Sequence, residues 1–154
     1  MKTVNPYLNF DGNTEEAFNF YKSVFGGEFL MLQRFEDVPS DVPSPGSDGN
    51  KIIHVSLPIG KSCILMASDR PSSIGKGIKG DNFSISVETE SEEETTKLFN
   101  ALSNGGKVTM PLAKTFWNAY FGGLTDKFGI QWMNTLYQNG SDQEGLPARY
   151  ANLT

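Results

Sequence analysis

The sequence predicts an α+β fold of two βαβββ modules that form an incomplete barrel with the helices on its outside. The order strand, helix, strand, strand, strand occurs twice along the chain. Gly26-Gly27 and Gly105-Gly106 each end a predicted helix, and Met66 and Met133 hold matching places in the last strand of each repeat. The glycine pairs are farther apart than the methionines, and a long loop in the first repeat accounts for the difference. A duplication with one insertion therefore explains the whole pattern.

The module boundaries follow from this repeat. We expect the first module over residues 1–70, a linker over 71–79, the second module over 80–137 and a polar tail over 138–154. A chain of 154 residues is long enough to bury a core without disulfides. Each module should place its helix on the outer face of a small, mostly antiparallel sheet.

In the first module, one helix lies between the first two strands. Asn13 or Thr14 is expected to cap it, and Gly26-Gly27 ends it after Phe25. Alternating or apolar segments predict strands at residues 4–10, 28–35, 51–58 and 62–68. Asp69, at the end of the last strand, is expected to shape the loop that follows it.

Residues 37–50 contain three prolines and two glycines, so no regular structure is expected there. Such a loop is either a solvated connection between strands or a flexible flap over a pocket. Both interpretations stay open at this point.

In the second module, four acidic residues precede a helix that ends at Gly105-Gly106. Strands are expected at residues 82–88 and 107–113, followed by a hairpin over 116–134 with its turn at 125–129. Asp126 and Gly129 are typical turn residues. Gly122 and Gly123 inside a strand indicate a bulge or a close approach by another group.

Composition excludes several classes of function. The formal net charge is −5 and no basic cluster is present, which argues against nucleic-acid binding. One cysteine, Cys63, permits neither an internal disulfide nor a zinc finger. No apolar run approaches the roughly 20 residues of a membrane span, and the N-terminus lacks the apolar core of a signal peptide. We therefore expect a cytoplasmic protein with neither membrane nor nucleic-acid partners.

His54 is the only histidine, and it is the candidate catalytic residue. Strand alternation would place it on one face with Ile52 and Ser56. If that face lines the cleft, the imidazole could act as an acid or base near neutral pH. The alternative is a histidine packed on the sheet and hydrogen-bonded to the backbone.

Aromatic and methionine side chains are concentrated near the predicted strand ends. They indicate either ordinary core or an apolar pocket for a flat aromatic or amphipathic ligand, which polar side chains such as His54 would orient. The expected ligand-binding residues are Asn9, Met66, Trp117, Tyr120, Phe121, Trp132, Met133 and Asn134.

Several segments resemble PhnB-like proteins of the vicinal oxygen chelate superfamily, which includes glyoxalases, bleomycin-resistance proteins and ring-cleaving dioxygenases. The segments are residues 6–10, 17–27, 53–55, 64–69, 116–117 and 124–129, and the likeness covers residues 3–137. The resemblance implies paired modules, a central pocket and a homodimer. PhnB-like proteins often carry a methyltransferase label, but no Gly-rich strand-to-helix turn that would hold a methyl donor is present.

Metal-using members of this superfamily carry a His on the first strand and a Glu on the last strand of each module. Carried onto this chain, those positions are Asn5, Asn82, Met66 and Met133. Amides and thioethers are poor ligands for Zn²⁺, Mg²⁺ or Fe²⁺. We therefore expect no metal site and no cofactor.

The sequence leaves three functions open. The first is a protein that binds a small amphipathic or aromatic molecule without metal. The second is an enzyme of lyase, isomerase or dioxygenase type that uses His54 as acid or base, or a metal site not recognised in the sequence. The third is a dimeric scaffold whose cleft is filled by its own side chains.

Overall fold

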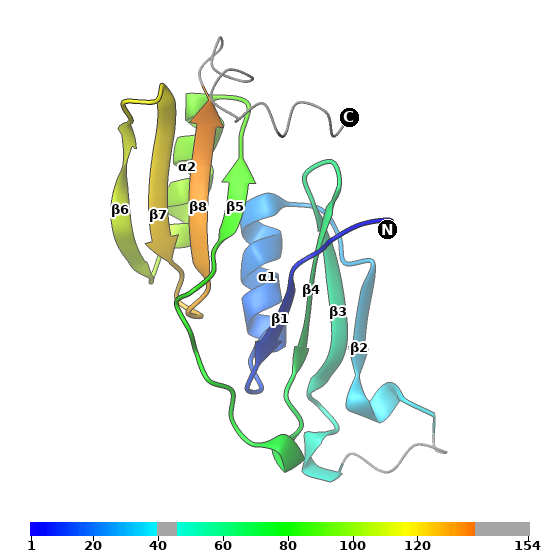
Figure 1. Cartoon of the computed structure of the whole chain (residues 1–154). Coiled ribbons are helices and arrows are strands. Elements are labelled where there is room, and N and C mark those ends of the chain that lie inside the picture. The colour runs from blue at the N-terminus through cyan, green and yellow to red at the C-terminus, as the bar shows by residue number, and fades with distance from the viewer. Residues whose placement is uncertain (40–45, 138–154) are drawn as a thin grey trace. The chain divides into compact units, whose positions relative to one another are not determined.

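The computed structural model describes residues 1–39 and 46–137. It contains the predicted repeat of strand, helix and three strands twice (Figure 1). The chain divides into two compact units, Met1–Lys79 and Gly80–Thr154. The centre of the predicted loop, 40–45, and the predicted tail, 138–154, lie outside the described residues. The predicted α+β class with two βαβββ modules is confirmed.

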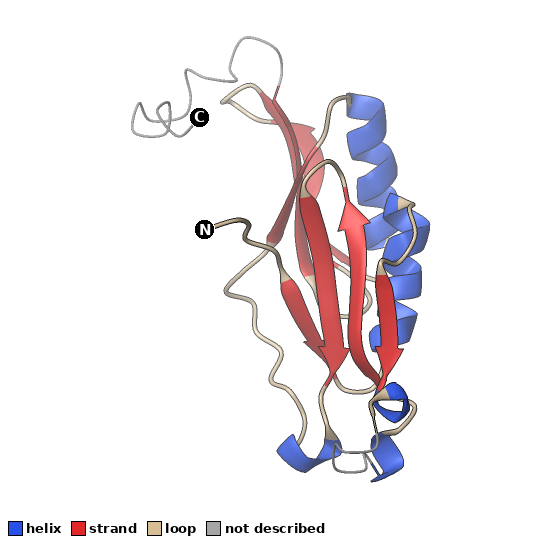
Figure 2. Cartoon of the chain, turned by 90° about the vertical axis from the view of Figure 1, so that its right-hand side faces the viewer, coloured by secondary structure: helices blue, strands red, loops and turns tan. Residues whose placement is uncertain are grey.

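Unit 1 contains a four-stranded sheet, here named sheet A, in the order β1-β4-β3-β2. β1 runs parallel to β4, and the other neighbours are antiparallel. The strands are β1 (Tyr7–Phe10), β2 (Met31–Arg34), β3 (Ile52–Ile59) and β4 (Cys63–Asp69), and the helix α1 spans Thr14–Phe25. In Figure 2 each unit's helix lies along one side of that unit's own strands, as expected for a sheet with one covered face.

The core of unit 1 lies between α1 and one face of sheet A. Leu8, Ala67 and Val55 are opposite one another on β1, β4 and β3, and all three are buried. On α1, Phe18 and Tyr21 are fully buried at helical spacing. The row that contains Leu8 therefore faces α1, and the neighbouring residues on each strand point to the opposite face.

The N-terminus of α1 is held by Asp69, not by the expected side-chain cap. Asn13 is the N-cap residue, but its side chain makes no capping hydrogen bond. Instead, Asp69 Oδ1 accepts hydrogen bonds from the backbone N–H of Gly12 at 2.9 Å and of Thr14 at 3.0 Å, and from Thr14 Oγ1 at 2.7 Å. Asp69 Oδ2 accepts from the N–H of Ile52 at 2.8 Å. One buried carboxylate thus joins the end of β4, the start of α1 and the start of β3.

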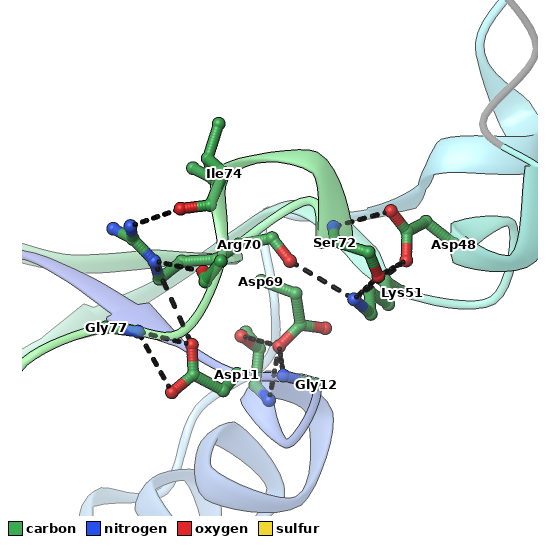
Figure 3. A network of polar contacts seen from close by, with 11 residues as sticks. Asp11, Gly12, Asp48, Lys51, Asp69, Arg70, Ser72, Ile74 and Gly77 are labelled. Atoms are coloured by element: carbon green, nitrogen blue, oxygen red, sulfur yellow. Dashed lines mark hydrogen bonds and ion pairs between the residues drawn. The ribbon is translucent and has the colours of Figure 1, made fainter.

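Polar contacts also hold the segments around the predicted loop and linker (Figure 3). The Asp48 carboxylate accepts hydrogen bonds from the Ser72 hydroxyl at 2.6 Å and the Ser72 N–H at 2.8 Å, and it pairs with Lys51 Nζ at 2.7 Å. These contacts, with Lys51 the largest, lower the pKa of Asp48 from 3.8 to about 2. Asp11 Oδ1 accepts from the N–H of Gly77 at 2.9 Å. Residues 71–79, expected as a linker, are therefore bonded to the first unit.

Unit 2 contains sheet B, with the strand order β5-β8-β7-β6 and the same pattern of one parallel and two antiparallel pairs. Ser91 caps its helix, because the Ser91 hydroxyl accepts a hydrogen bond from the N–H of Glu94 at 3.1 Å. The strands are β5 (Ile85–Glu88), β6 (Lys107–Lys114), β7 (Ala119–Thr125) and β8 (Gln131–Tyr137), and the helix α2 spans Glu92–Ser103.

The predicted hairpin is present, but its first strand starts later than expected. Asn118 has a positive φ of 63°, and the N–H of Thr115 donates to the carbonyl of Ala119 at 2.7 Å. This turn joins β6 to β7, so Phe116 and Trp117 lie in a turn and not in a strand. The predicted turn after β7 is confirmed: Asp126 Oδ1 accepts from the N–H groups two and four residues later.

Gly122 allows the close approach that its place in a strand predicted. A Cβ at this position would lie 2.8 Å from Phe99 Cε2 on α2 and 2.9 Å from Leu112 Cδ2. Gly122 therefore faces α2, and by alternation Tyr120 and Leu124 face it too. Among the described residues, no helix is long and apolar enough to cross a membrane.

Candidate functional site

The face of sheet A opposite α1 collects the predicted site residues of unit 1. Residues directly opposite each other on neighbouring strands share a face. Met31, Ser56, Met66 and Tyr7 form one such row across all four strands. We name this surface face A, and it comprises Tyr7, Asn9, Met31, Gln33, His54, Ser56, Met66 and Ser68.

His54 and Tyr7 make the central polar contact of face A. The Tyr7 hydroxyl lies 3.3 Å from His54 Nδ1. The two ring centroids are 5.8 Å apart, with the planes tilted by 37°. His54 is half-buried, whereas Tyr7 is 45% exposed. The pair is therefore close enough to share a proton and open enough to meet a small molecule.

The remaining side chains of face A are uncharged. Asn9 is opposite Ser68, and Gln33 is opposite His54, so amide and hydroxyl groups share the face of the imidazole. Met66 lies opposite Tyr7 and adds an apolar, polarizable surface beside it. This arrangement can form directed hydrogen bonds to a neutral polar group and apolar contacts to the rest of a ligand.

The predicted grouping of His54 with Ile52 and Ser56 is only partly right. Ser56 shares face A with His54. Ile52, however, is buried, and the register between β2 and β3 shifts between Gln33 and Arg34. Gln33 is opposite His54 and Arg34 is opposite Ile52, so Ile53 is an extra residue that interrupts the alternation.

In unit 2, three of the predicted ligand-binding residues lie on the side of sheet B that α2 covers. Trp132 is 1% exposed, and its Nε1–H donates to Asp126 Oδ2 at 2.9 Å. The Tyr120 hydroxyl is 3.4 Å from Thr96 Oγ1 on α2. Asn134 is fully buried opposite Gly122, and neither polar atom of its side chain has a hydrogen-bond partner among the described residues.

The other three predicted residues of unit 2 lie away from α2 or at the β6–β7 turn. Phe121 and Met133 alternate with residues that face α2, so they point to the opposite face, which we name face B. The Trp117 ring is 47% exposed, and its centroid is 6.3 Å from that of Phe121. The structure thus brings together Asn9, His54 and Met66 in unit 1, and Trp117, Phe121 and Met133 in unit 2.

The residues at the superfamily's metal positions do not fit a hard divalent cation. Asn5 Oδ1 accepts a hydrogen bond from the N–H of Ile64 at 3.1 Å, so this side chain ties the segment before β1 to β4. Met66 and Met133 offer thioethers where a carboxylate would be needed. Within residues 1–39 and 46–137, no group of three or more His, Cys, Asp or Glu side chains could hold a metal ion.

Tyr7 is a site residue that the sequence reasoning missed. Its alternation with Asn9 on the first strand was readable, and it would have placed both residues on one face. Its contact with His54 was not readable, because the two residues are far apart in sequence and meet only through β4 and β3.

Comparison with known proteins gives a consistent result. Residues 2–135 match the model of the family described as 3-demethylubiquinone-9 3-methyltransferase. The Escherichia coli protein YjdN is 31% identical over 138 residues, which are 84% of this chain and 92% of YjdN.

Solved structures agree with this match. The Pseudomonas aeruginosa protein PA1353 is 43% identical, with a TM-score of 0.76 over 89% of this chain and 98% of that one. A Bacillus cereus PhnB protein is 31% identical, with a TM-score of 0.70 over 87% of this chain and 98% of that one. A glyoxalase/bleomycin resistance protein/dioxygenase family enzyme from Burkholderia phytofirmans, 20% identical over 86% of this chain and 97% of that one, shares the fold with a TM-score of 0.56. The chain shares the fold of the glyoxalase/bleomycin resistance protein/dioxygenase family enzyme, and it belongs to the family described as 3-demethylubiquinone-9 3-methyltransferase, to which the match with the PhnB protein also points.

Proposed function

We propose that this protein binds a small amphipathic or aromatic molecule on face A without the help of a divalent metal ion. The observation that carries the proposal is the shared face of His54, Asn9 and Met66, three residues from three different strands, opposite the helix-covered core. A strand face that served only packing would be apolar, and this one carries an exposed tyrosine paired with the only histidine.

The chemistry of face A fits a ligand with one polar end. Tyr7 and Met66 offer apolar contact area next to each other. Asn9 and His54 offer hydrogen bonds that would fix the ligand's orientation. Sites of this kind, with a few directed polar groups on an apolar surface, bind small molecules with affinities of about micromolar order.

Methyl transfer is not proposed, although the family description names a methyltransferase. A methyl-donor site of the common kind needs a Gly-rich turn from a strand into a helix. Here β1 leads into α1 through Asp11, Gly12 and Asn13, and β5 leads into α2 through Thr89, Glu90 and Ser91. Asp69 already occupies the N–H groups at the start of α1.

The resemblance to glyoxalase-fold proteins also supports a homodimer. Analytical ultracentrifugation of the purified protein at several concentrations tests this point. A single species with the mass of one chain at all concentrations would refute the dimer and leave the ligand proposal unaffected.

A titration with the amphipathic dye 1-anilinonaphthalene-8-sulfonate tests the binding proposal. We expect saturable binding that is unchanged after treatment with a chelator. Met66→Ala should weaken binding about tenfold, because it removes apolar contact on face A. Met110→Ala, at an exposed methionine of unit 2, is the matched control and should bind as the wild type does.

Three results would overturn the proposal. The first is the absence of saturable binding, and the second is an equal effect of the two methionine substitutions. The third is binding that the chelator abolishes and an added divalent cation restores. If a substrate is found, His54→Ala that keeps affinity but removes turnover would instead support an enzyme with His54 as acid or base.

A further inference from the structure

We infer that Tyr7 fixes His54 in the tautomer with its proton on Nε2, so that face A selects ligands that carry a carbonyl oxygen. The inference deepens the proposed function of face A and rests on it. It assigns Tyr7 as a positioning residue and His54 as the hydrogen-bond donor to the ligand.

The contact between the two side chains determines which nitrogen carries the proton. The Tyr7 hydroxyl meets His54 at Nδ1, at 3.3 Å. A phenol is a stronger acid than a neutral imidazole N–H, and an imidazole nitrogen is a stronger base than a phenol oxygen. The favoured hydrogen bond therefore runs from the Tyr7 hydroxyl to a bare Nδ1. The proton of the neutral ring is then on Nε2.

Nε2–H is left to meet the ligand. The contact with Tyr7 is the one hydrogen bond that the side chain of His54 makes within the described part of the chain. None of the eight residues of face A carries a carboxylate that could accept from this N–H. A molecule that covers His54 excludes solvent from Nε2, so it must supply an acceptor or leave the donor unpaired.

The corresponding positions of sheet B show that this donor is specific to unit 1. Met133 matches Met66, so Ser86 and Phe121 occupy the places of Tyr7 and His54. Neither residue can form a phenol–imidazole pair. The preference for an acceptor should therefore belong to face A alone.

The first test needs no ligand. Because the chain has one histidine, protein labelled with ¹⁵N-histidine gives NMR signals from a single imidazole ring. At about pH 8.5, where an ordinary imidazole is neutral, we expect a protonated Nε2 and a bare Nδ1. In Tyr7→Phe both shifts should move as the hydrogen bond to Nδ1 is lost. A proton on Nδ1, or shifts unchanged in Tyr7→Phe, would overturn the role given to Tyr7.

The second test measures ligand selection with two probes of nearly equal shape. 2-Acetylnaphthalene carries a carbonyl oxygen, and 2-isopropenylnaphthalene has a CH₂ group in its place. We expect the ketone to bind about tenfold more tightly. His54→Phe should bring the ratio of the two affinities close to one, and Tyr7→Phe should reduce it about threefold. Tyr137→Phe, which also removes one exposed phenol oxygen, is the control and should keep the wild-type ratio.

The outcomes separate the two proposals. Equal affinities for both probes in the wild-type protein would overturn the carbonyl preference and leave small-molecule binding intact. A ratio that survives in His54→Phe would overturn the role of His54. Failure of both probes to bind would overturn the proposed function as well.

Discussion

The two units share one topology but hold their helices in different ways. In unit 1, the start of α1 is bonded to Asp69, which comes from the far end of the unit's last strand. In unit 2, the start of α2 is bonded to Ser91, the residue directly before the helix. A local cap stabilises only its own helix. The remote carboxylate joins helix, sheet and loop, so its loss should affect the whole of unit 1.

The units also differ on the sheet faces opposite their helices. Face A combines a phenol–imidazole pair with neutral amides and hydroxyls. At the matching positions, face B has Ser86 and Phe121, with Met133 beside them. A duplicated module therefore keeps its backbone pattern, while the phenol–imidazole pair is present only on face A. The proposed chemistry follows this difference.

Removal of Asp69 should have the largest effect. Asp69→Ala leaves three backbone N–H groups and the Thr14 hydroxyl without their buried acceptor. We expect a loss of roughly 3–5 kcal/mol in the free energy of unfolding, measured by urea denaturation. Ser91→Ala in unit 2 should cost only about 1 kcal/mol.

If Asp69→Ala does not fold, Asp69→Asn provides the same comparison, because it keeps one oxygen acceptor. It should still cost more than Ser91→Ala. Equal costs for the two caps would contradict the distinction between a remote and a local cap.

Gly122 tests how tightly α2 packs on sheet B. In unit 1 the matching position is Val55, so the sheet there tolerates a side chain where unit 2 does not. Gly122→Ala places a Cβ 2.8 Å from the Phe99 ring and should destabilise the protein by about 1–3 kcal/mol. Gly123→Ala is the control, since its nearest neighbour is Thr109 Oγ1 at 3.2 Å. Thermal unfolding should rank Gly122→Ala as the more harmful change, and the reverse order would refute this packing.

Asn134 should respond in the opposite direction. Its side chain is buried, and both of its polar atoms are unpaired within the part of the chain that the structure describes, whereas the matching position in unit 1 is Ala67. Replacing an unpaired buried amide with a methyl group removes a desolvation cost, although it leaves a small cavity. We expect Asn134→Ala to raise the free energy of unfolding by about 1 kcal/mol. The reverse exchange in unit 1, Ala67→Asn, should destabilise the protein. A loss of stability in Asn134→Ala would show that the Asn134 amide has a hydrogen-bond partner in solution.

Much of the fold could be predicted because it depends on local signals. Glycine pairs ended both helices, alternation marked most strands, and Asp126 with Gly129 marked the hairpin turn. The start of β7 was misplaced because the aromatic residues Phe116 and Trp117 favour strands, while the positive φ of Asn118 makes a turn there.

The candidate site was harder to predict because it depends on strand register. Alternation alone could not tell which face of each sheet the helix covers. The sequence prediction therefore placed Trp132 and Asn134, which lie against α2, in the same ligand site as Met133, which points to the opposite face. The contact between Tyr7 and His54 exists only because β4 pairs with both β1 and β3. One extra residue near Ile53 was enough to break the expected face of β3.

Loss of the contacts of Asp48 should have the smallest effect on stability. The pH dependence of this effect follows from proton binding by the Asp48 carboxyl group. Hydrogen bonds from Lys51 and Ser72 lower the pKa of Asp48 from 3.8 to about 2 in the folded protein. The unfolded chain therefore binds more protons at this carboxyl between these values, and the stability that Asp48 contributes rises with pH across that range. It is fully present above about pH 4 and is lost as the pH falls through about 2. Melting temperatures of the wild type and Asp48→Asn should differ most above about pH 4 and converge toward about pH 2. Asp81→Asn, at an exposed aspartate, is the control. If the melting temperature of Asp48→Asn differs from that of the wild type as much at about pH 2 as at neutral pH, the role of Asp48 in holding residues 71–79 to unit 1 is refuted.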